Sequence, residues 1–460
     1  MKHFLRFFAF TIYFCFSLAS HRAAARPPNI VIILADDMGY GDLGCYGNPV
    51  INTPNLDRMA AQGLRFTDFY AGSCLCTPSR AALMTGRFPI RSGMGGDDKH
   101  HVLYPNNHGG IPASEILIPQ ALKKKGYVTG AIGKWHLGDL PDWLPTRHGF
   151  DSFFGLPYSN DSDWINAKVR KTDPLSQNPD WHHFNVPLMR DMQIIERPVD
   201  QTTLTKRYTE EAIRFIKANR RKPFFLYFAH TFPHVPLFAS PAFKNKSPRG
   251  RFGDAVQELD HSVGQVLECL RKEGLEKNTF VFFSSDNGPW LTKKWNGGSA
   301  SLLKDGKGGT WEGGYRVPGI ARWPGKIRPG VTHELGSLMD LYNTSLTLAG
   351  APIPNDRPID GVDMSPILFQ NKKSNRDTIY YYYTTNLYAI RKGKYKAHFI
   401  THDGYSKQPA VVHDPPLLFD LEEDPGEHFD LAAEHPDIVA EMKKLEDYQN
   451  ARITAGPRQY

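Results

Sequence analysis

The sequence predicts an α/β fold, a large mostly parallel sheet sandwiched by helices, with a smaller C-terminal subdomain that contains an antiparallel sheet. Four runs of apolar and β-branched residues have the length of buried strands and end abruptly in polar residues. Helical patterns alternate with these runs, which is typical of crossover units between parallel strands. After about Arg376 the pattern changes to short alternating segments, which indicates antiparallel strands.

The four predicted strands all deliver polar side chains at their carboxyl ends. The strands are expected at Asn29 to Ala35, Tyr127 to Gly133, Pro223 to Ala229 and Thr279 to Ser285. The polar residues that follow them are Asp36 and Asp37, then Lys134 and His136, then His230 and His234, and finally Asp286 and Asn287. In open α/β sheets the functional site lies beyond the carboxyl ends of the strands. We therefore expect these residues to meet in one place.

Two helices can be placed between the strands from their end signals and apolar spacing. Thr53 can cap the first, with Pro54 at its first position and Gly63 as its stop. The second is expected from Asp254 to Leu270, where apolar residues recur at helical spacing.

The C-terminal part is expected to form a subdomain of its own, after a catalytic domain that spans residues 26–375. Within residues 376–460, strands are expected at Ile379 to Thr384, Leu387 to Ile390 and Tyr395 to Ile400. Pro436 to Ala451 has the pattern of a closing helix.

Residues 1–25 have the pattern of a cleaved signal peptide. Lys2 and Arg6 precede an apolar run from Phe7 to Leu18, and small residues follow at 23–25. The run is shorter than the roughly 20 residues of a membrane span, and an uncleaved anchor is the alternative. We expect an exported protein without a membrane segment after cleavage, secreted or periplasmic, or lysosomal if the source is eukaryotic.

The charge and cysteine content of the 460 residues exclude two classes of protein. The formal net charge of +7 is spread along the chain, so no nucleic-acid-binding stripe is predicted and an acidic substrate is favoured. Cys15 would leave with the signal. The cysteines that remain, Cys45, Cys74, Cys76 and Cys269, are too few for a disulfide framework in a chain of this size.

The acidic residues at two of the strand ends predict a metal site. Asp36, Asp37, Asp286 and Asn287 offer the oxygen donors that Ca²⁺ or Mg²⁺ prefers. Either pair taken alone is equally compatible with capping of the next helix. Like charges gathered at converging strand ends are costly without a cation, so the joint pattern favours metal binding.

The segment from Ser73 to Arg87 predicts a loop that enters a helix, with Cys76 or Thr77 near the cap, Pro78 at the first position and Gly86 at the stop. Cys76 would then lie at a helix N-terminus, which favours an anion. Arg80, one turn on, could present its planar fork to a carboxylate, phosphate or sulfate. The residues alone support equally a buried structural cysteine beside a surface arginine.

The sequence CTPSR at 76–80, continuing as AALMTGR, is similar to the signature of type I sulfatases of the alkaline phosphatase superfamily. Other segments resemble that family in the same order along the chain: ADDMGYGDLGCYG from Ala35, TPNLDRMAAQGLRF from Thr53, GKWHLG from Gly133, SSDNG from Ser284, GKGGTWEGGYRVP from Gly306 and LFDLEEDPGE from Leu418. The match covers nearly all of the chain after the signal. It is most like the arylsulfatase A and N-acetylgalactosamine-6-sulfatase branch.

The resemblance implies a modified cysteine and a metal. A separate maturing enzyme would oxidise Cys76 to formylglycine (3-oxoalanine), and one Ca²⁺ ion, or less favourably Mg²⁺, would be bound by Asp36, Asp37, Asp286, Asn287 and an oxygen of residue 76. One hydroxyl of the hydrated aldehyde would attack sulfur to give a covalent sulfate intermediate. The second hydroxyl would lose its proton, sulfate would leave, and the aldehyde would return.

The resemblance also implies roles for further residues. Arg80 would steady the hydroxylate, while Lys134 and Lys307 would hold sulfate oxygens. His136 fits the base, and His234 fits a contact to sulfate and the leaving group. Either Lys307 or His234 would protonate the leaving oxygen. Without the resemblance, lysines and histidines of this kind are more simply explained as solvated or structural residues.

The leaving-group pocket is expected in residues 97–112, where His101 and Tyr104 are candidates and an ordinary surface loop is the alternative. The predicted substrate is a sulfated carbohydrate, of galactose or N-acetylgalactosamine type, or an aryl sulfate. A phosphodiester or phosphonate monoester hydrolase of the same superfamily is one rival, because the same groups stabilise phosphoryl transfer. An inactive homologue that binds sulfated glycans is the other, although every position needed for the chemistry is filled.

Overall fold

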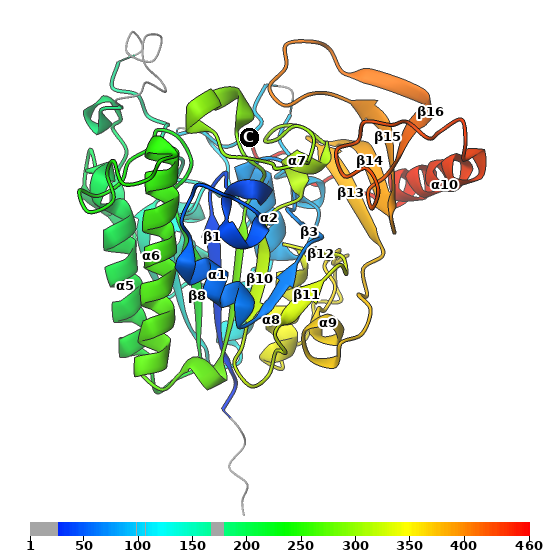
Figure 1. The fold of residues 1–460 in the computed structure, drawn as a ribbon. Helices are drawn as coiled ribbons and strands as arrows, with labels where there is room; N and C mark the ends of the chain where they lie inside the picture. The colour runs from blue at the N-terminus through cyan, green and yellow to red at the C-terminus, as the bar shows by residue number, and fades with distance from the viewer. Residues whose placement is uncertain (1–25, 98, 106, 167–178) are drawn as a thin grey trace, which may run out of the picture.

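A computed structural model of the chain describes residues 26–97, 99–105, 107–166 and 179–460 (Figure 1). The expected signal peptide, residues 1–25 with Cys15, lies outside the described residues. Among the described helices, none has the length and apolar character needed to cross a membrane.

The body is built on a ten-stranded sheet with the order β11-β2-β10-β9-β1-β8-β4-β5-β6-β7. Its strands are β1 (Asn29–Ala35), β2 (Leu64–Phe66), β4 (Val128–Lys134), β5 (Ser152–Leu156), β6 (Leu188–Arg190), β7 (Gln193–Glu196), β8 (Phe224–Ala229), β9 (Thr279–Ser285), β10 (Gly319–Arg322) and β11 (Gly330–Thr332). The central strand β1 pairs in parallel with β8 and β9, and β4 pairs in parallel with β8 and β5. The predicted mostly parallel sheet is therefore confirmed.

The outer strands depart from the parallel pattern. β10 is antiparallel to both β9 and β2, and β6 and β7 form an antiparallel edge beyond β5. A further pair, β3 (Phe69–Tyr70) and β12 (Gly336–Ser337), is parallel and separate from the main sheet. These short strands carry too few residues for a recognisable run, so the sequence did not predict them.

Helices cover both faces of the main sheet, as predicted. The alternating side chains of β1 show the two layers, because Ile30 and Ile32 belong to one apolar core and Val31 and Ile33 to the other. The first core is covered by α2 (Cys76–Thr85), α3 (Ile118–Lys123) and α8 (Asp340–Leu348), and the second by α1 (Pro54–Ala61), α5 (Leu204–Ala218) and α6 (Gly250–Lys272). Each buried aliphatic side chain contributes about 1.5–3 kcal/mol to folding.

A second sheet lies at one side of the body in Figure 1. It is antiparallel, with the order β13 (Thr378–Tyr383), β14 (Asn386–Lys392), β15 (Tyr395–Thr401) and β16 (Val411–Asp420), and it packs against α10 (Pro436–Arg452). Three of these strands and the helix lie where the sequence predicted them. β16 was not predicted because Pro415 and Pro416 argue against a strand, but it lies at the edge of the sheet, where proline is tolerated.

A buried group of charges, the interface network, joins the second sheet to the main body. It consists of Asp68, Tyr70, Glu312, Arg316, Tyr381, Arg391, Lys396, His398 and Glu427. Glu312 lies in the short helix α7 (Glu312–Tyr315), accepts hydrogen bonds from the hydroxyls of Tyr70 and Tyr381, and pairs with Lys396 at 3.1 Å. Lys396 also pairs with Glu427 at 3.0 Å. Buried ion pairs and hydrogen bonds thus join the second sheet to the main body.

Candidate active site

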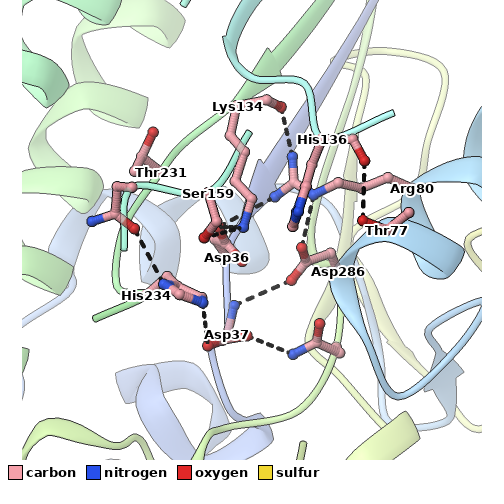
Figure 2. Close-up of polar contacts among 12 residues, drawn as sticks. Asp36, Asp37, Thr77, Arg80, Lys134, His136, Ser159, Thr231, His234 and Asp286 are labelled. Atoms are coloured by element: carbon pink, nitrogen blue, oxygen red, sulfur yellow. Dashed lines mark hydrogen bonds and ion pairs between the residues drawn. The ribbon is translucent and has the colours of Figure 1, made fainter. Parts of the chain in front are cut away.

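The carboxyl ends of the central parallel strands meet at one edge of the sheet, as the sequence predicted. Asp36 and Asp37 follow β1, and Asp286 follows β9 beside them. Lys134 ends β4 on the other side of β8. Figure 2 shows these side chains converging with those of Arg80, His136 and His234. We call the buried residues Asp36, Asp37, Arg80, Lys134, Asp286, Asn287 and Lys307 the site cluster.

Each aspartate of the site cluster is paired with a cation. The Nζ atom of Lys134 lies 2.5 Å from Oδ2 of Asp36, and that of Lys307 lies 2.7 Å from Oδ1 of Asp37. The Nε atom of Arg80 donates to Oδ2 of Asp286 at 2.9 Å. A second guanidinium nitrogen, Nη1, donates to the carbonyl oxygen of Lys134 at 2.7 Å. Arg80 therefore ties helix α2 to the ends of β9 and β4.

Two acceptor oxygens of the site cluster have no hydrogen-bond partner although they are buried, namely Oδ1 of Asp36 and Oδ1 of Asn287. The amide nitrogen of Asn287 donates to Asp37 at 2.7 Å, which turns its oxygen away as a free acceptor. Ligand atoms of Asp36, Asp37 and His234 lie within 4.8 Å of one another. Unpartnered oxygens are costly in an interior. The oxygens of Asp36, Asp37 and Asn287 fit a hard divalent cation such as Ca²⁺.

The aspartates of the site cluster do not ionise equally. Burial raises the pKa of Asp286 to about 7, and the neighbouring charge of Asp36 adds to the effect. Burial also raises the pKa of Asp37, against the opposing effect of Lys307. For Asp36, burial is outweighed by Lys134, His234 and Arg80, which hold its pKa below the usual range. A bound dication would favour the ionised form of all three carboxyls.

Cys76 is the first residue of α2, and the helix ends at Gly86, whose φ of 67° is left-handed. The predicted start at Pro78 was wrong by two residues. Proline is tolerated there because the first-turn amides of a helix have no intrahelical partner. Burial raises the pKa of the Cys76 thiol to about 11, in opposition to Lys134 and Lys307. The residue is therefore a neutral thiol at neutral pH, which is a poor nucleophile.

His136 presents an unpartnered nitrogen in the site. Its Nε2 lies 2.8 Å from the carbonyl oxygen of Leu103, so Nε2 must carry the proton, and Nδ1 is buried without a partner. Burial, and after it the charge of Lys134, lower its pKa well below the ordinary value. Its backbone φ of 61° is left-handed, as is the 64° of Asp37. Such strained backbone is concentrated at functional sites. Because its pKa is lowered and Nδ1 is unprotonated, His136 is a neutral imidazole that could accept a proton at Nδ1.

His234 lies on the other side of the aspartates. Its Nδ1 faces two oxygens, Oδ1 of Asn160 at 3.2 Å and the carbonyl of Val235 at 2.5 Å, so Nδ1 carries the proton. Its Nε2 lies 3.5 Å from Oδ2 of Asp37. His230 instead packs its ring against Phe228 at the end of β8, with centroids 4.4 Å apart. Of the two histidines after β8, the structure brings His234 to the site cluster.

The two candidate pocket residues lie on a loop that passes over the site. Leu103, between them, accepts from His136 through its carbonyl and donates its amide to Oγ1 of Thr77 at 3.2 Å. The ring of His101 packs edge-on against Tyr383 with centroids 5.5 Å apart, at the end of β13. Tyr104 is 48% exposed. The loop thus reaches the site through Leu103, while His101 and Tyr104 lie on either side of it.

Several residues of the site were not predicted. Ser159 accepts from Nζ of Lys134 at 3.1 Å, and Asn160 orients His234. Both follow β5, another parallel strand, so the strand-end rule could have found them. Thr77 donates to the carbonyl of His136 at 3.1 Å. Trp290 stacks beside the site with its ring centroid 5.4 Å from that of His234, which no local pattern indicated.

Comparisons with known proteins match nearly the whole chain. The Sulfatase family model matches residues 28–351, and the model for the C-terminal region of aryl-sulfatase matches residues 374–460. Human arylsulfatase A is 43% identical over 472 residues, which covers 96% of this chain and 92% of the relative. Human N-acetylgalactosamine-6-sulfatase is 43% identical over 474 residues, which covers 95% and 88%. The crystal structure of PsFucS1 sulfatase from Pseudoalteromonas sp. matches with a TM-score of 0.83 and 31% identity, covering 94% of this chain and 92% of that chain.

Proposed function

This chain belongs to the sulfatase family and is an enzyme that hydrolyses sulfate esters, and we propose that it acts on a sulfated carbohydrate through oxidised Cys76 and a bound Ca²⁺ ion. One observation carries the mechanistic part of this proposal. Cys76, the first residue of α2, is close enough to Lys134, Lys307, Asp36 and Asp286 to be affected by their charges, and their cluster leaves two acceptor oxygens unpartnered. Such an arrangement supports binding of a cation and of an anionic ester in one place.

Asp36, Asp37, Asp286 and Asn287 would hold the ion, together with an oxygen on residue 76. All of these donors are hard oxygens, which favours Ca²⁺, or less favourably Mg²⁺, over softer metals. When bound, the ion would supply Lewis acidity that stabilises negative charge on the sulfate and lowers the pKa of a hydroxyl on residue 76.

The neutral thiol of Cys76 supports the need for a modification. Conversion to formylglycine by a maturing enzyme, followed by hydration, would supply two hydroxyl groups where the thiol offers none. One would serve as the nucleophile and the other would allow sulfate to be released. Export of the chain, secreted or periplasmic, remains part of the proposal and rests on residues 1–25.

The remaining residues would bind sulfate and move protons. Lys134 and Lys307 would exchange part of their contact with Asp36 and Asp37 for sulfate oxygens, and so stabilise the transition state. His136 would accept a proton from residue 76 at Nδ1. Because Nε2 of His234 lacks a proton in this tautomer, we assign protonation of the leaving oxygen to Lys307.

The carbohydrate substrate is supported by the relatives. One relative that is 43% identical is named for N-acetylgalactosamine 6-sulfate ester hydrolysis, so we propose a galactose or N-acetylgalactosamine-type sugar. An aryl sulfate would serve as a simple assay substrate, by analogy with the arylsulfatase relative.

A comparison of 4-nitrophenyl sulfate with 4-nitrophenyl phosphate tests the reaction, because the same site could stabilise phosphoryl transfer. We expect faster hydrolysis of the sulfate, and faster hydrolysis of the phosphate would overturn the assignment. Mass spectrometry of the Cys76 peptide from the native host tests the modification. An unmodified thiol there would support a binding protein without catalytic activity.

A further inference from the structure

Three side chains at the mouth of the site belong to none of the roles above. Trp290 follows the turn after β9, Lys293 lies in the short helix η9 (Leu291–Asn296), and Tyr405 lies in the loop between β15 and β16. They come from both parts of the chain, since the loop that carries Tyr405 connects two strands of the second sheet. The ring of Tyr405 and the ammonium group of Lys293 both contact the indole ring of Trp290.

Trp290 connects this group to the site cluster. Its ring centroid lies 5.4 Å from that of His234, and Nζ of Lys307 lies 4.4 Å from it. Tyr405 stacks on the same indole, with centroids 5.0 Å apart and an interplanar angle of 27°. The group therefore lies next to the residues proposed to bind sulfate.

The loop that carries Tyr405 is fixed against the segment that carries Lys307. The amide of Gly404 donates to Oδ2 of Asp305 at 2.7 Å, and the indole of Trp311 donates to Oδ1 of Asp403 at 3.0 Å. Gly404 has no room for a side chain, because a Cβ there would lie 2.4 Å from the carbonyl oxygen of Lys307. This close approach places the backbone before Tyr405 against Lys307, and 42% of Tyr405 stays exposed.

The carboxylates of Asp161 and Asp37 act on the charge of Lys293 from a distance, without a close ion pair among the described residues. Its Nζ lies 4.0 Å from the centroid of Trp290, and within the described part of the chain it forms no ion pair. Lys307, on the same indole, is in contrast paired with Asp37. Nε1 of Trp290 is itself buried without an acceptor. The group thus offers an ammonium outside any close ion pair, an indole N–H without an acceptor, and the partly exposed ring of Tyr405.

A sulfated sugar satisfies all three features. The C–H face of a pyranose ring packs against an aromatic ring, its hydroxyls accept hydrogen bonds, and a second acidic group pairs with an ammonium. We propose that Tyr405, Trp290 and Lys293 form a leaving-group subsite that selects a sugar carrying a second anionic group besides the ester that is cleaved. The sugar ring lies on the exposed face of Tyr405, and Lys293 pairs with the second sulfate or carboxylate. This inference rests on the proposed function.

The test compares two sugars that differ by one sulfate. N-acetylgalactosamine 6-sulfate and N-acetylgalactosamine 4,6-disulfate are assayed for sulfate release by the matured, full-length enzyme. For wild type, kcat/KM should be higher for the disulfate. In Lys293→Met the ratio of the two kcat/KM values should fall about tenfold, chiefly through KM, because one charge-assisted contact is lost. Lys294→Met, at the neighbouring lysine, should leave the ratio unchanged.

Variants of Tyr405 test the stacking. Tyr405→Ala should raise KM about tenfold for both sugars, Tyr405→Phe should restore the wild-type KM because it keeps the ring, and Tyr448→Ala on α10 is the exposed aromatic control. If Lys293→Met and Lys294→Met change the ratio of the two kcat/KM values equally, or if neither changes it, the proposed subsite is wrong while the proposed function stands. Absence of sulfate release from every sulfate ester by matured wild type overturns the proposed function, and the subsite with it.

Discussion

The site cluster and the interface network contain the same formal charges, but they differ in whether every carboxylate oxygen has a hydrogen-bond or ion-pair partner. Each holds three carboxylates and three lysine or arginine side chains. In the site cluster these are Asp36, Asp37 and Asp286 with Arg80, Lys134 and Lys307. In the interface network they are Asp68, Glu312 and Glu427 with Arg316, Arg391 and Lys396. In the interface network every carboxylate oxygen has a partner, including Oδ2 of Asp68, which accepts from Thr67 at 2.6 Å. In the site cluster Oδ1 of Asp36 has none.

This difference has a consequence for protonation. For Glu312, burial is outweighed by Lys396, Arg316 and Arg391, and its pKa falls to about 2. For Asp286, burial prevails and the pKa rises to about 7. In a closed network the loss of any one partner leaves a buried charge uncompensated, whereas the site cluster keeps an oxygen that an added cation could bind. Substitutions in the two clusters should therefore separate activity from stability.

The largest effect is expected at Cys76. Cys76→Ala removes the proposed precursor of the nucleophile, so kcat should fall by at least about 10⁴-fold, while the thermal unfolding midpoint stays close to that of wild type. Sulfate release and thermal unfolding are measured on the same preparation.

Cys74→Ala is the matched control, because Cys74 is also buried and also free, two residues before the helix. It should keep its activity. Full activity in Cys76→Ala would contradict the mechanism.

At Lys396 in the interface network we expect a loss of stability with little change in activity. Lys396→Met leaves Glu312 and Glu427 without their shared cation, so the free energy of unfolding should fall by about 3–5 kcal/mol. The kcat of the folded fraction should change little. Adding Glu312→Gln should recover part of the loss, because it removes one uncompensated charge. Denaturant unfolding measures all three proteins, and unchanged stability in Lys396→Met would show that the network is not what holds the two sheets together.

His398 provides a pH-dependent test of the same network. Burial, and then Lys396, lower its pKa to about 4, against about 6.5 in an unfolded chain. Between these values the unfolded chain binds a proton that the folded protein does not. The free energy of unfolding is therefore highest above pH 6.5, and it falls by about 3 kcal/mol as the pH decreases to 4 because His398 stays neutral in the folded protein. His398→Gln should show a shallower fall in unfolding free energy between pH 7 and 4.5, and an identical slope in the two proteins would disprove this assignment.

The sequence predicted the parts of the site that depend on local pattern. Buried strands are recognisable as apolar runs, so β1 and β9 lie at the predicted residues and deliver Asp36 and Asp286 together. Contacts made by distant segments leave no such pattern. Tyr405 reaches Trp290 only because its loop docks on residues 305–312, and the free oxygen of Asn287 depends on which way its amide turns. The prediction that Cys76 is modified was implied by the family resemblance alone.

The smallest of these effects, Ca²⁺ binding, tests directly what the unpartnered oxygens of the site cluster are for. A ligand present at about 100 times its Kd stabilises the folded state by about 2.7 kcal/mol, so Ca²⁺ should raise the unfolding midpoint of wild type and a chelator should lower it. Asn287→Leu keeps the size and net charge but removes one free oxygen, and should lose most of the shift. Glu427→Gln, in the closed network, should keep the full shift despite its lower stability. A Ca²⁺ response that survives in Asn287→Leu would mean that this oxygen is no ligand, and equal loss in both variants would mean that the open and closed clusters do not differ in function.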